Sequence, residues 1–79
     1  MTYFVYMLLC QDDSYYTGSS NNIEKRFKDH ISGKGARYTK SHKPIKIVYK
    51  EKFATKSEAL KREAEIKSWS RKKKENLIQ

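Results

Sequence analysis

The single cysteine, Cys10, constrains the fold more than any other feature of this sequence, because no disulfide can form within the chain. The two histidines, His30 and His42, do not complete a zinc-finger spacing with it. The 79 residues therefore have to be held together by packed helices and strands alone. A domain of this size buries about 60% of the surface that its unfolded chain exposes, so we expect a single domain over residues 1–79 with a thin core.

The charge balance narrows the class of partner. The sequence has 18 Lys and Arg against 9 Asp and Glu, which gives a formal net charge of +9. Such an excess attracts polyanions, with nucleic acid the first candidate and an anionic membrane the second. No apolar run approaches the ~20 residues of a membrane span, and residues 1–10 lack a basic region and a small-residue cleavage site. These features predict a cytoplasmic protein that binds nucleic acid and no membrane.

The first half of the chain reads as a hairpin followed by a helix. Tyr3–Cys10 and Tyr15–Ser19 are rich in aromatic and aliphatic residues, and Gln11–Ser14 between them has turn chemistry. Asn21 or Asn22 can cap a helix over Ile23–Ile31. We expect Ile23, Phe27 and Ile31 on its buried stripe, with Gly33 as its C-terminal stop.

The second half predicts one more strand and two helices. Apolar residues alternate with lysines over Ile45–Phe53, which favours a strand with one exposed face. The inward positions of that strand would be Ile45, Ile47, Tyr49 and Phe53. Thr55 and Glu58 form a capping box for a long helix that ends near Lys67 or Trp69, and Ser70 caps a final helix over residues 71–78. The order ββαβαα indicates an α+β fold with a three-stranded, mainly antiparallel sheet flanked by helices.

One carboxylate falls in the apolar stripe of the long helix. Glu63 projects from near the centre of a stripe formed by Ala59, Leu60, Ala64 and Ile66. An unpaired carboxylate out of water would cost several kcal/mol or more, so it needs a cation, a hydrogen-bond network or a metal. One alternative is a structural ion pair, with Lys67 or with an arginine from another element. The other is a metal site.

Two tyrosines on the hairpin raise a question of register. Tyr6 and Tyr16 are either core or surface cover, or they share a face and line a site. A shared face requires an odd-length connection, as when Cys10 pairs with Tyr16, or a β-bulge, whereas pairing Cys10 with Tyr15 places them on opposite faces. Arg26 and His30 lie four residues apart at the border of the following helix stripe.

These residues together carry a resemblance to a known family. In chain order they are Tyr6, Tyr16, Gly18, Arg26 and Glu63, and this ordered set resembles the GIY-YIG nuclease domain. Within that superfamily the sequence is most similar to the short stand-alone bacterial proteins of the YhbQ/YazA type. They share the stretches seen here at residues 36–39 and 61–67, and the likeness covers residues 3–78.

The resemblance implies metal-dependent hydrolysis of nucleic-acid phosphodiesters, with DNA favoured over RNA and DNA repair as the setting. In the family, the glutamate matching Glu63 holds one divalent ion, Mg²⁺ or Mn²⁺, and the arginine matching Arg26 faces the scissile phosphate. The tyrosines matching Tyr6 and Tyr16 position or activate the attacking water. His30 is an alternative proton acceptor, because a tyrosine with a pKa of about 10 is mostly protonated at neutral pH.

Several positions depart from the family pattern, and a slow nuclease is therefore expected. Phe4, Val5 and Thr17 replace residues of the two signature triplets, and Ser19 stands where the excision-repair branch has a lysine. Asn76 lies near the position of that branch's catalytic asparagine. A non-catalytic module that binds DNA or RNA on the same fold is the alternative. A homodimer or a protein partner would supply specificity that a lone domain lacks.

Two basic clusters are the candidate nucleic-acid contacts, unless they are ordinary solvated surface. The first surrounds an aromatic residue that could stack on a base and comprises Lys34, Arg37, Tyr38, Lys40 and Lys43. The second opens the final helix and comprises Arg71, Lys72, Lys73 and Lys74. Trp69 beside the second cluster is either a base-stacking residue or a core anchor.

Overall fold

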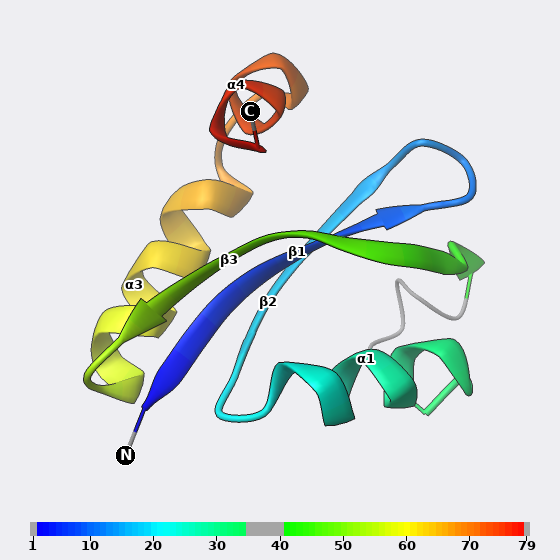
Figure 1. Ribbon diagram of the computed structural model, residues 1–79. Helices are drawn as coiled ribbons and strands as arrows, with labels where there is room; N and C mark the ends of the chain where they lie inside the picture. The colour runs from blue at the N-terminus through cyan, green and yellow to red at the C-terminus, as the bar shows by residue number, and fades with distance from the viewer. Residues whose placement is uncertain (1, 35–40, 79) are drawn as a thin grey trace.

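A computed structural model of the chain describes residues 2–34 and 41–78. Its elements are β1 (Tyr3–Cys10), β2 (Tyr15–Ser20), α1 (Ile23–Ile31), β3 (Pro44–Phe53), α3 (Lys56–Lys67) and α4 (Arg71–Ile78). The strands form one antiparallel sheet in the order β2-β1-β3 (Figure 1). The predicted α+β class and the ββαβαα order are confirmed.

The hairpin connection places both candidate tyrosines on one face of the sheet. The Cys10 N–H donates to the Ser14 carbonyl at 2.9 Å and the Asp13 N–H donates to the Cys10 carbonyl at 3.0 Å. Asp13 has a φ of 65°, as expected for a tight turn followed by a left-handed residue. Cys10 therefore pairs with neither Tyr16 nor Tyr15. The connection is still odd in length, so the residues opposite Gly18 and Tyr16, which are Tyr6 and Leu8, share a face.

Strand β3 departs from the predicted alternation because it carries two register shifts. Met7 pairs with Tyr49 and Leu8 with Ile47, so Val48 is an extra residue between the two pairs. A second shift leaves Ile45 unpaired and 53% exposed. The prediction that Ile45 points inward is therefore wrong.

The helix ends follow the predicted capping chemistry. At the start of α1, Asn22 accepts a hydrogen bond from the Lys25 N–H at 3.1 Å. At its end, Gly33 has a φ of 83°, and the Lys34 N–H donates to the Asp29 carbonyl at 2.8 Å. Thr55 Oγ1 accepts from the Glu58 N–H at 3.2 Å. The Glu58 carboxylate, however, accepts from the Thr55 hydroxyl at 3.1 Å, where a capping box predicts the backbone N–H. Ser70 caps α4 through the Lys73 N–H at 3.3 Å.

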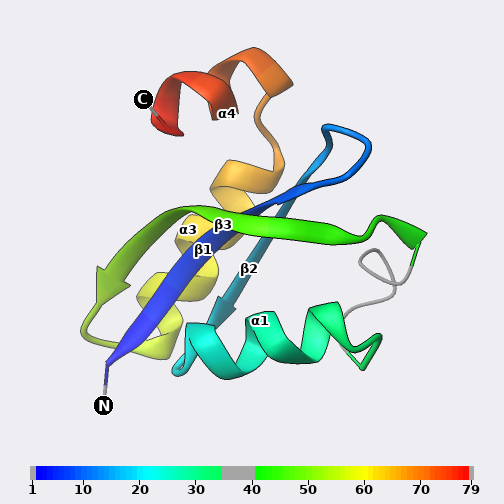
Figure 2. The ribbon, with the colours of Figure 1, turned by 45° about the vertical axis from the view of Figure 1, so that its right-hand side comes forward.

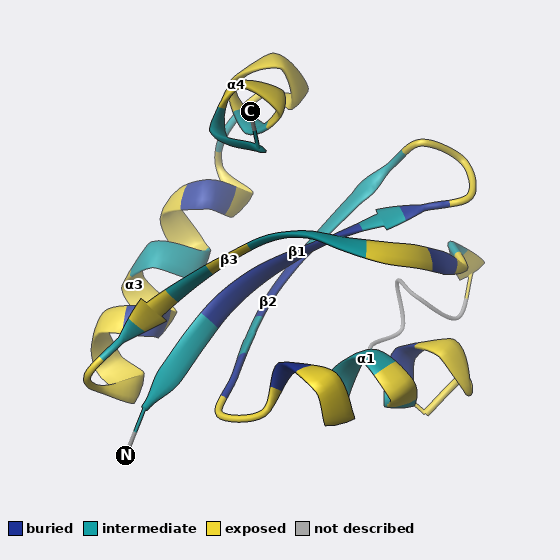
Figure 3. Ribbon diagram, in the orientation of Figure 1, coloured by how far each residue is buried: buried dark blue, intermediate teal, exposed yellow. Residues whose placement is uncertain are grey.

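The central strand is buried on both faces (Figure 3). On one face Val5 and Met7 pack with Ala59 and Ile66 of α3, and the end of α4 covers the rim of this cluster. Figure 2 shows α3 behind the strands on this side. We refer to this side as the α3 face.

On the other face, the α1 face, Tyr6 and Leu8 of β1 pack with Ile23 of α1. Phe27 of α1 is partly buried against the same cluster, and His30 one turn later is 1% exposed. Ile31 is 47% exposed. The predicted α1 stripe is therefore wrong at Ile31, whose place in the packed stripe is taken by His30.

Candidate active site

The Tyr6 ring lies directly over Gly18 of the edge strand β2. A Cβ atom built on Gly18 would lie 2.7 Å from the Tyr6 hydroxyl and 3.0 Å from a ring carbon of Tyr16. Real Cβ atoms do not approach other atoms so closely. The missing side chain at Gly18 thus lets the hydroxyl of a central-strand residue reach over the edge strand.

His30 of α1 completes a buried aromatic cluster with the two tyrosines. The Tyr6 hydroxyl lies 3.0 Å from His30 Nε2. The ring centroids of Tyr16 and His30 are 5.0 Å apart, and those of Tyr6 and Tyr16 are 6.3 Å apart. The sequence predicts His30 at the border of the α1 stripe, whereas the structure places it in the buried part of that stripe.

Burial sets the protonation of the hydrogen-bonded pair. Burial, followed by the neighbouring Tyr16, raises the pKa of Tyr6 to about 12. Burial and then the nearby Arg26 charge lower the pKa of His30. At neutral pH the phenol therefore keeps its proton and the imidazole is uncharged. In the neutral tautomer that carries its proton on Nδ1, His30 Nε2 can accept the Tyr6 O–H.

Arg26 joins this cluster from one turn earlier on α1. A hydrogen bond from its side chain to the Tyr6 hydroxyl, together with its positive charge, acts to lower the Tyr6 pKa. Burial outweighs both effects, since the net shift is upward. Arg26 is half-buried, so its side chain contacts the buried cluster while part of it remains exposed to solvent, and a guanidinium so placed can bind an anion.

Glu63 reaches the same edge strand from the α3 face. Its Oε1 accepts a hydrogen bond from the Ser19 hydroxyl at 2.7 Å, and its Oε2 pairs with Lys67 Nζ at 2.8 Å. The Glu63 side chain is 15% exposed and that of Lys67 is 52% exposed. The structure therefore contains the ion pair with Lys67 that was one of the two explanations for this carboxylate.

The phenol and the carboxylate lie on either side of one strand. Gly18, under the Tyr6 hydroxyl, and Ser19, which binds Glu63, are consecutive residues of β2. Side chains alternate along a strand, so the Gly18 position faces α1 and Ser19 faces α3. The Glu63 charge is nevertheless one of the influences that raise the pKa of Tyr6. The two groups are thus electrostatically coupled across the edge strand.

The apolar stripe predicted on α3 is only partly present. Ala59 and Ile66 are fully buried, whereas Leu60 is 45% exposed and Ala64 is exposed. The helix is turned so that Arg62 and Glu63 occupy the half-buried positions between the two buried residues. Glu63 does face the body of the protein, but it lies at the rim of the packed surface.

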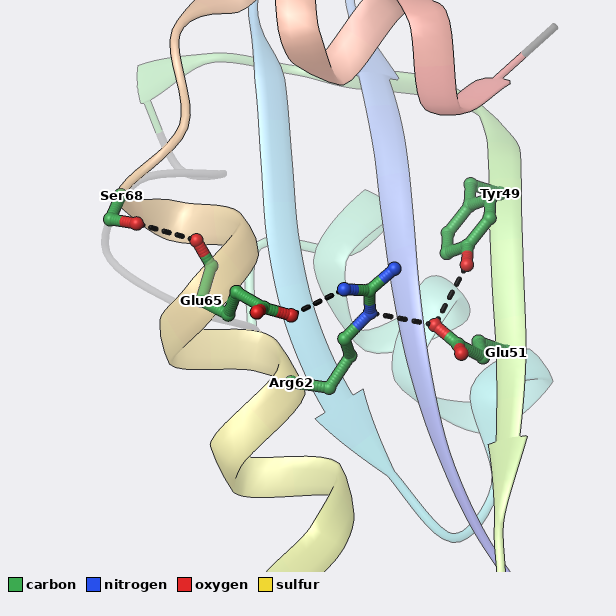
Figure 4. Close-up of polar contacts among 5 residues, drawn as sticks. All are labelled: Tyr49, Glu51, Arg62, Glu65 and Ser68. Carbon is green, nitrogen blue, oxygen red and sulfur yellow. Dashed lines mark hydrogen bonds and ion pairs between the residues drawn. The ribbon is translucent and has the colours of Figure 1, made fainter.

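Arg62 ties α3 to the far strand of the sheet (Figure 4). Its Nε donates to Glu51 Oε1 at 3.0 Å, and the same oxygen accepts from the Tyr49 hydroxyl at 2.8 Å. Its other end pairs with Glu65, and the guanidinium stacks 5.0 Å from the Trp69 ring. This network fixes the rotation of α3 and hence the direction of the neighbouring Glu63. Sequence reasoning missed it, because nothing in the spacing links Glu51 to Arg62.

The second basic cluster is partly structural. Arg71 donates to the Asp13 carbonyl and stacks 4.8 Å from the Tyr15 ring, while Lys73 lies 4.5 Å from the centroid of Trp69. Trp69 is half-buried against the α3-face core, so it acts as an anchor. Lys72 is exposed, as is Lys34 of the first cluster. Arg37, Tyr38 and Lys40 lie outside the described residues.

The described residues limit what kind of metal site is available. Nowhere in residues 2–34 and 41–78 do three or more His, Cys, Asp or Glu side chains gather in a metal-binding arrangement. The Glu63 carboxylate lies across the edge strand from the tyrosine cluster and offers hard oxygen donors, and one carboxylate suffices for Mg²⁺ when waters and a substrate phosphate fill the other positions. The same residues contain no helix that is long and apolar enough to cross a bilayer.

The model of the GIY-YIG catalytic domain matches residues 2–76. The chain belongs to the GIY-YIG family, a family of nucleases that are generally dependent on divalent metals.

Sequence relatives and solved structures agree with this assignment. The chain is 54% identical over 76 residues to UPF0213 protein SSP2268 of Staphylococcus saprophyticus, covering 96% of this chain and 93% of the relative. A relative from Natronomonas pharaonis, UPF0213 protein NP_0776A, is 47% identical over 76 residues, which is 96% of this chain and 89% of that protein.

Two solution NMR structures share the fold. UPF0213 protein BH0048 of Bacillus halodurans is 45% identical, with a TM-score of 0.63 over 99% of this chain and 83% of that one. Protein EF2693 of E. faecalis is 44% identical, with a TM-score of 0.65 over 96% and 81% of the two chains.

Proposed function

We propose that this protein hydrolyses phosphodiester bonds of nucleic acid, with DNA the favoured substrate and Mg²⁺ or Mn²⁺ as cofactor. The observation that carries the proposal is the buried hydrogen bond between Tyr6 and His30, set beside Arg26 at an edge strand. A buried phenol and a neutral imidazole in contact can pass a proton from one to the other, as a general base requires.

In this mechanism Tyr6 and His30 act together as the base. The Tyr6 oxygen accepts a proton from the attacking water while the Tyr6 proton passes to His30 Nε2. This relay removes the difficulty of a phenol with a pKa of about 12, because Tyr6 never has to exist as a free phenolate. The water oxygen then bonds to phosphorus as the bond from phosphorus to the leaving oxygen breaks, and the leaving oxygen takes up a proton from solvent while His30 later returns its extra proton to solvent.

Arg26 and Glu63 supply charge on the two sides of the reaction. The Arg26 guanidinium stabilises negative charge that develops on the phosphoryl oxygens. Glu63 is the residue that would hold the divalent ion, which when bound neutralises phosphate charge and favours attack. Ser19 orients the Glu63 carboxylate through Oε1. The exposed Lys67 ammonium would give up its place at Oε2, since its long side chain is free to swing into solvent.

A panel of labelled DNA and RNA structures, incubated with and without Mn²⁺, tests the proposal. Metal-dependent cleavage of at least one DNA structure is the expected result, and tight binding with no cleavage would contradict it. The competing function is a non-catalytic binding module. The Glu63–Lys67 ion pair favours that alternative, because it satisfies the carboxylate without any metal.

A further inference from the structure

A hollow of 340 Å³ opens on the α1 face beside the tyrosine cluster. It is lined by Phe4, Asn21, Asn22, Ile23, Glu24, Ile47 and Lys50. Phe4 lies two residues before Tyr6 on the same side of β1, and Lys50 is the residue opposite Tyr6 on β3. The hollow and the candidate catalytic phenol therefore share one face and lie next to each other.

The lining combines apolar residues, which we call the floor, with polar ones. Phe4, Ile23 and Ile47 are buried or half-buried and belong to the apolar cluster of this face. Amide, carboxylate and ammonium groups from Asn21, Glu24 and Lys50 surround it. The volume lies near the lower end of the range of about 300 to 1,000 Å³ for small-molecule sites, which suits a single planar ring system.

We propose that this hollow receives one unpaired nucleobase next to the phosphate that is cleaved. The base would lie against Phe4, the amides would contact its edge, and Lys50 would hold a neighbouring phosphate. A base inside an intact duplex cannot reach such a hollow without leaving its stack. This inference rests on the proposed function and specifies its substrate as DNA that carries an unpaired nucleotide, as at a gap, a bulge or a single-stranded branch.

The test measures binding in EDTA, so that no cleavage intervenes. Two labelled duplexes are compared that differ at one bulged position, which carries either a base or an abasic site. Wild-type protein should bind the base-containing duplex more tightly by roughly 5- to 100-fold, the range that stacking of one base on an aromatic residue produces. Equal affinity for the two duplexes would overturn the inference.

Variants locate the preference in the hollow. Ile47→Trp fills the floor and should abolish the difference between the two duplexes, as should Phe4→Ala. Lys50→Gln should weaken binding of both duplexes alike. Lys46→Gln removes the same charge from an exposed β3 position that pairs with Leu9 and does not line the hollow, so it is the matched control. Melting temperatures verify that each variant is folded. If Ile47→Trp and Phe4→Ala both fold and retain the full base preference, the hollow is not the site.

The binding result and the cleavage result can fail separately. A base preference that Ile47→Trp abolishes, without Mn²⁺-dependent cleavage by wild type, supports the hollow as a base site and overturns the nuclease proposal. Cleavage by wild type that is indifferent to the abasic substitution supports the nuclease and overturns the base site.

Discussion

The two faces of the sheet use the same strand in opposite ways. On the α3 face, Val5 and Met7 of β1 meet apolar side chains, and charged groups such as Arg62 are confined to the rim. On the α1 face, Tyr6 and His30 bring a phenol and an imidazole into the centre of the packing. Each buried polar group needs a hydrogen-bond partner. Residues of the α1 face can therefore be replaced less freely than the apolar residues of the α3 face.

This difference assigns separate tasks to the two faces. The α3 face supplies most of the apolar burial and fixes α3 through the Arg62 network, which carries Glu63 to the edge strand. The α1 face holds the groups that can move a proton. One strand, β2, separates them, and its Gly18 and Ser19 connect to one side each. Substitutions on the two sides should therefore show which residues contribute to stability and which contribute to activity.

The largest expected effect is on the cleavage rate, and it comes from Glu63 at the rim of the α3 face. Glu63→Gln should lower the cleavage rate by about 100-fold or more, because the charge that would hold a divalent ion is removed. The amide oxygen can still accept from Ser19, and the lost pair with the exposed Lys67 is worth about 1 kcal/mol or less. Cleavage rate and melting temperature on one preparation measure both effects. Glu75→Gln, on the exposed surface of α4 and outside the Arg62 network, is the matched control and should leave cleavage nearly unchanged.

A purely structural Glu63 would give a different pattern. The Gln variant would then keep the wild-type nuclease rate, with the same small loss of stability. That pair of results would remove Glu63 from the site and leave the α1 face as a binding surface alone.

Gly18→Ala should have the next largest effect, and on the α1 face. The added methyl would meet the Tyr6 hydroxyl at 2.7 Å, so the Tyr6 ring must shift. We expect a loss of about 1 to 3 kcal/mol of stability, as for overpacking in a core, and at least about tenfold slower cleavage.

Gly33→Ala provides the comparison for Gly18→Ala. Gly33 has nothing within 4 Å of the added atom, but its φ of 83° makes alanine strained. It should lose about 1 kcal/mol and keep its cleavage rate. NMR shifts of Tyr6 and Tyr16 should change in the first variant and stay constant in the second. Equal cleavage by both variants would show that the Tyr6 position does not matter.

A smaller, pH-dependent effect should distinguish the buried imidazole. The pKa of His30 is lowered in the folded state, so the unfolded chain binds more protons below the ordinary value of 6.5. The free energy of unfolding should therefore decrease as the pH falls from 6.5 towards the lowered pKa. His30→Gln removes this titration, and its stability should change less as the pH falls below 6.5.

The titration of Asp12 does not account for a change in the free energy of unfolding just below pH 6.5. Hydrogen bonds from Ser14 and His42 lower its pKa to about 2, so its contribution is lost only as the pH falls below 3.8. Denaturant unfolding at closely spaced pH values provides the measurement. Parallel pH profiles for wild type and His30→Gln would contradict the assignment of a neutral, buried His30.

Local chemistry made much of the fold predictable, whereas the assembly of the site was not. Asn22, Gly33 and Ser70 sit at helix ends for reasons that act over a few residues, and each prediction was confirmed. The register of β3 was missed at Ile45, because bulges depend on the partner strand. Glu63 could be found from its place on a packed helix, whereas Tyr6, Tyr16, Gly18 and Arg26 were found as a set through the family resemblance.

Long-range partners could not be found from the sequence. Ser19 was considered as a missing cation, yet it donates to Glu63, a contact between residues 44 apart. Rotation of α3 about its axis also depends on Arg62 and Glu51, so the predicted stripe was wrong at Leu60 and Ala64. Helical periodicity gives relative positions on a helix and leaves its rotation against the sheet open.

The smallest expected effects concern two cations of α4. Arg71 is docked against the hairpin, and Lys72 is exposed. If about five phosphates are contacted, log affinity for duplex DNA should fall against log salt with a slope near −4 to −5. Lys72→Gln should flatten that slope by about 1 without changing the melting temperature, because its side chain is exposed. Arg71→Gln should also lower the melting temperature, since Arg71 binds the Asp13 carbonyl and stacks on Tyr15. Titrations at four salt concentrations measure the slopes. A wild-type slope near zero would exclude nucleic acid as the partner and with it the nuclease on the α1 face.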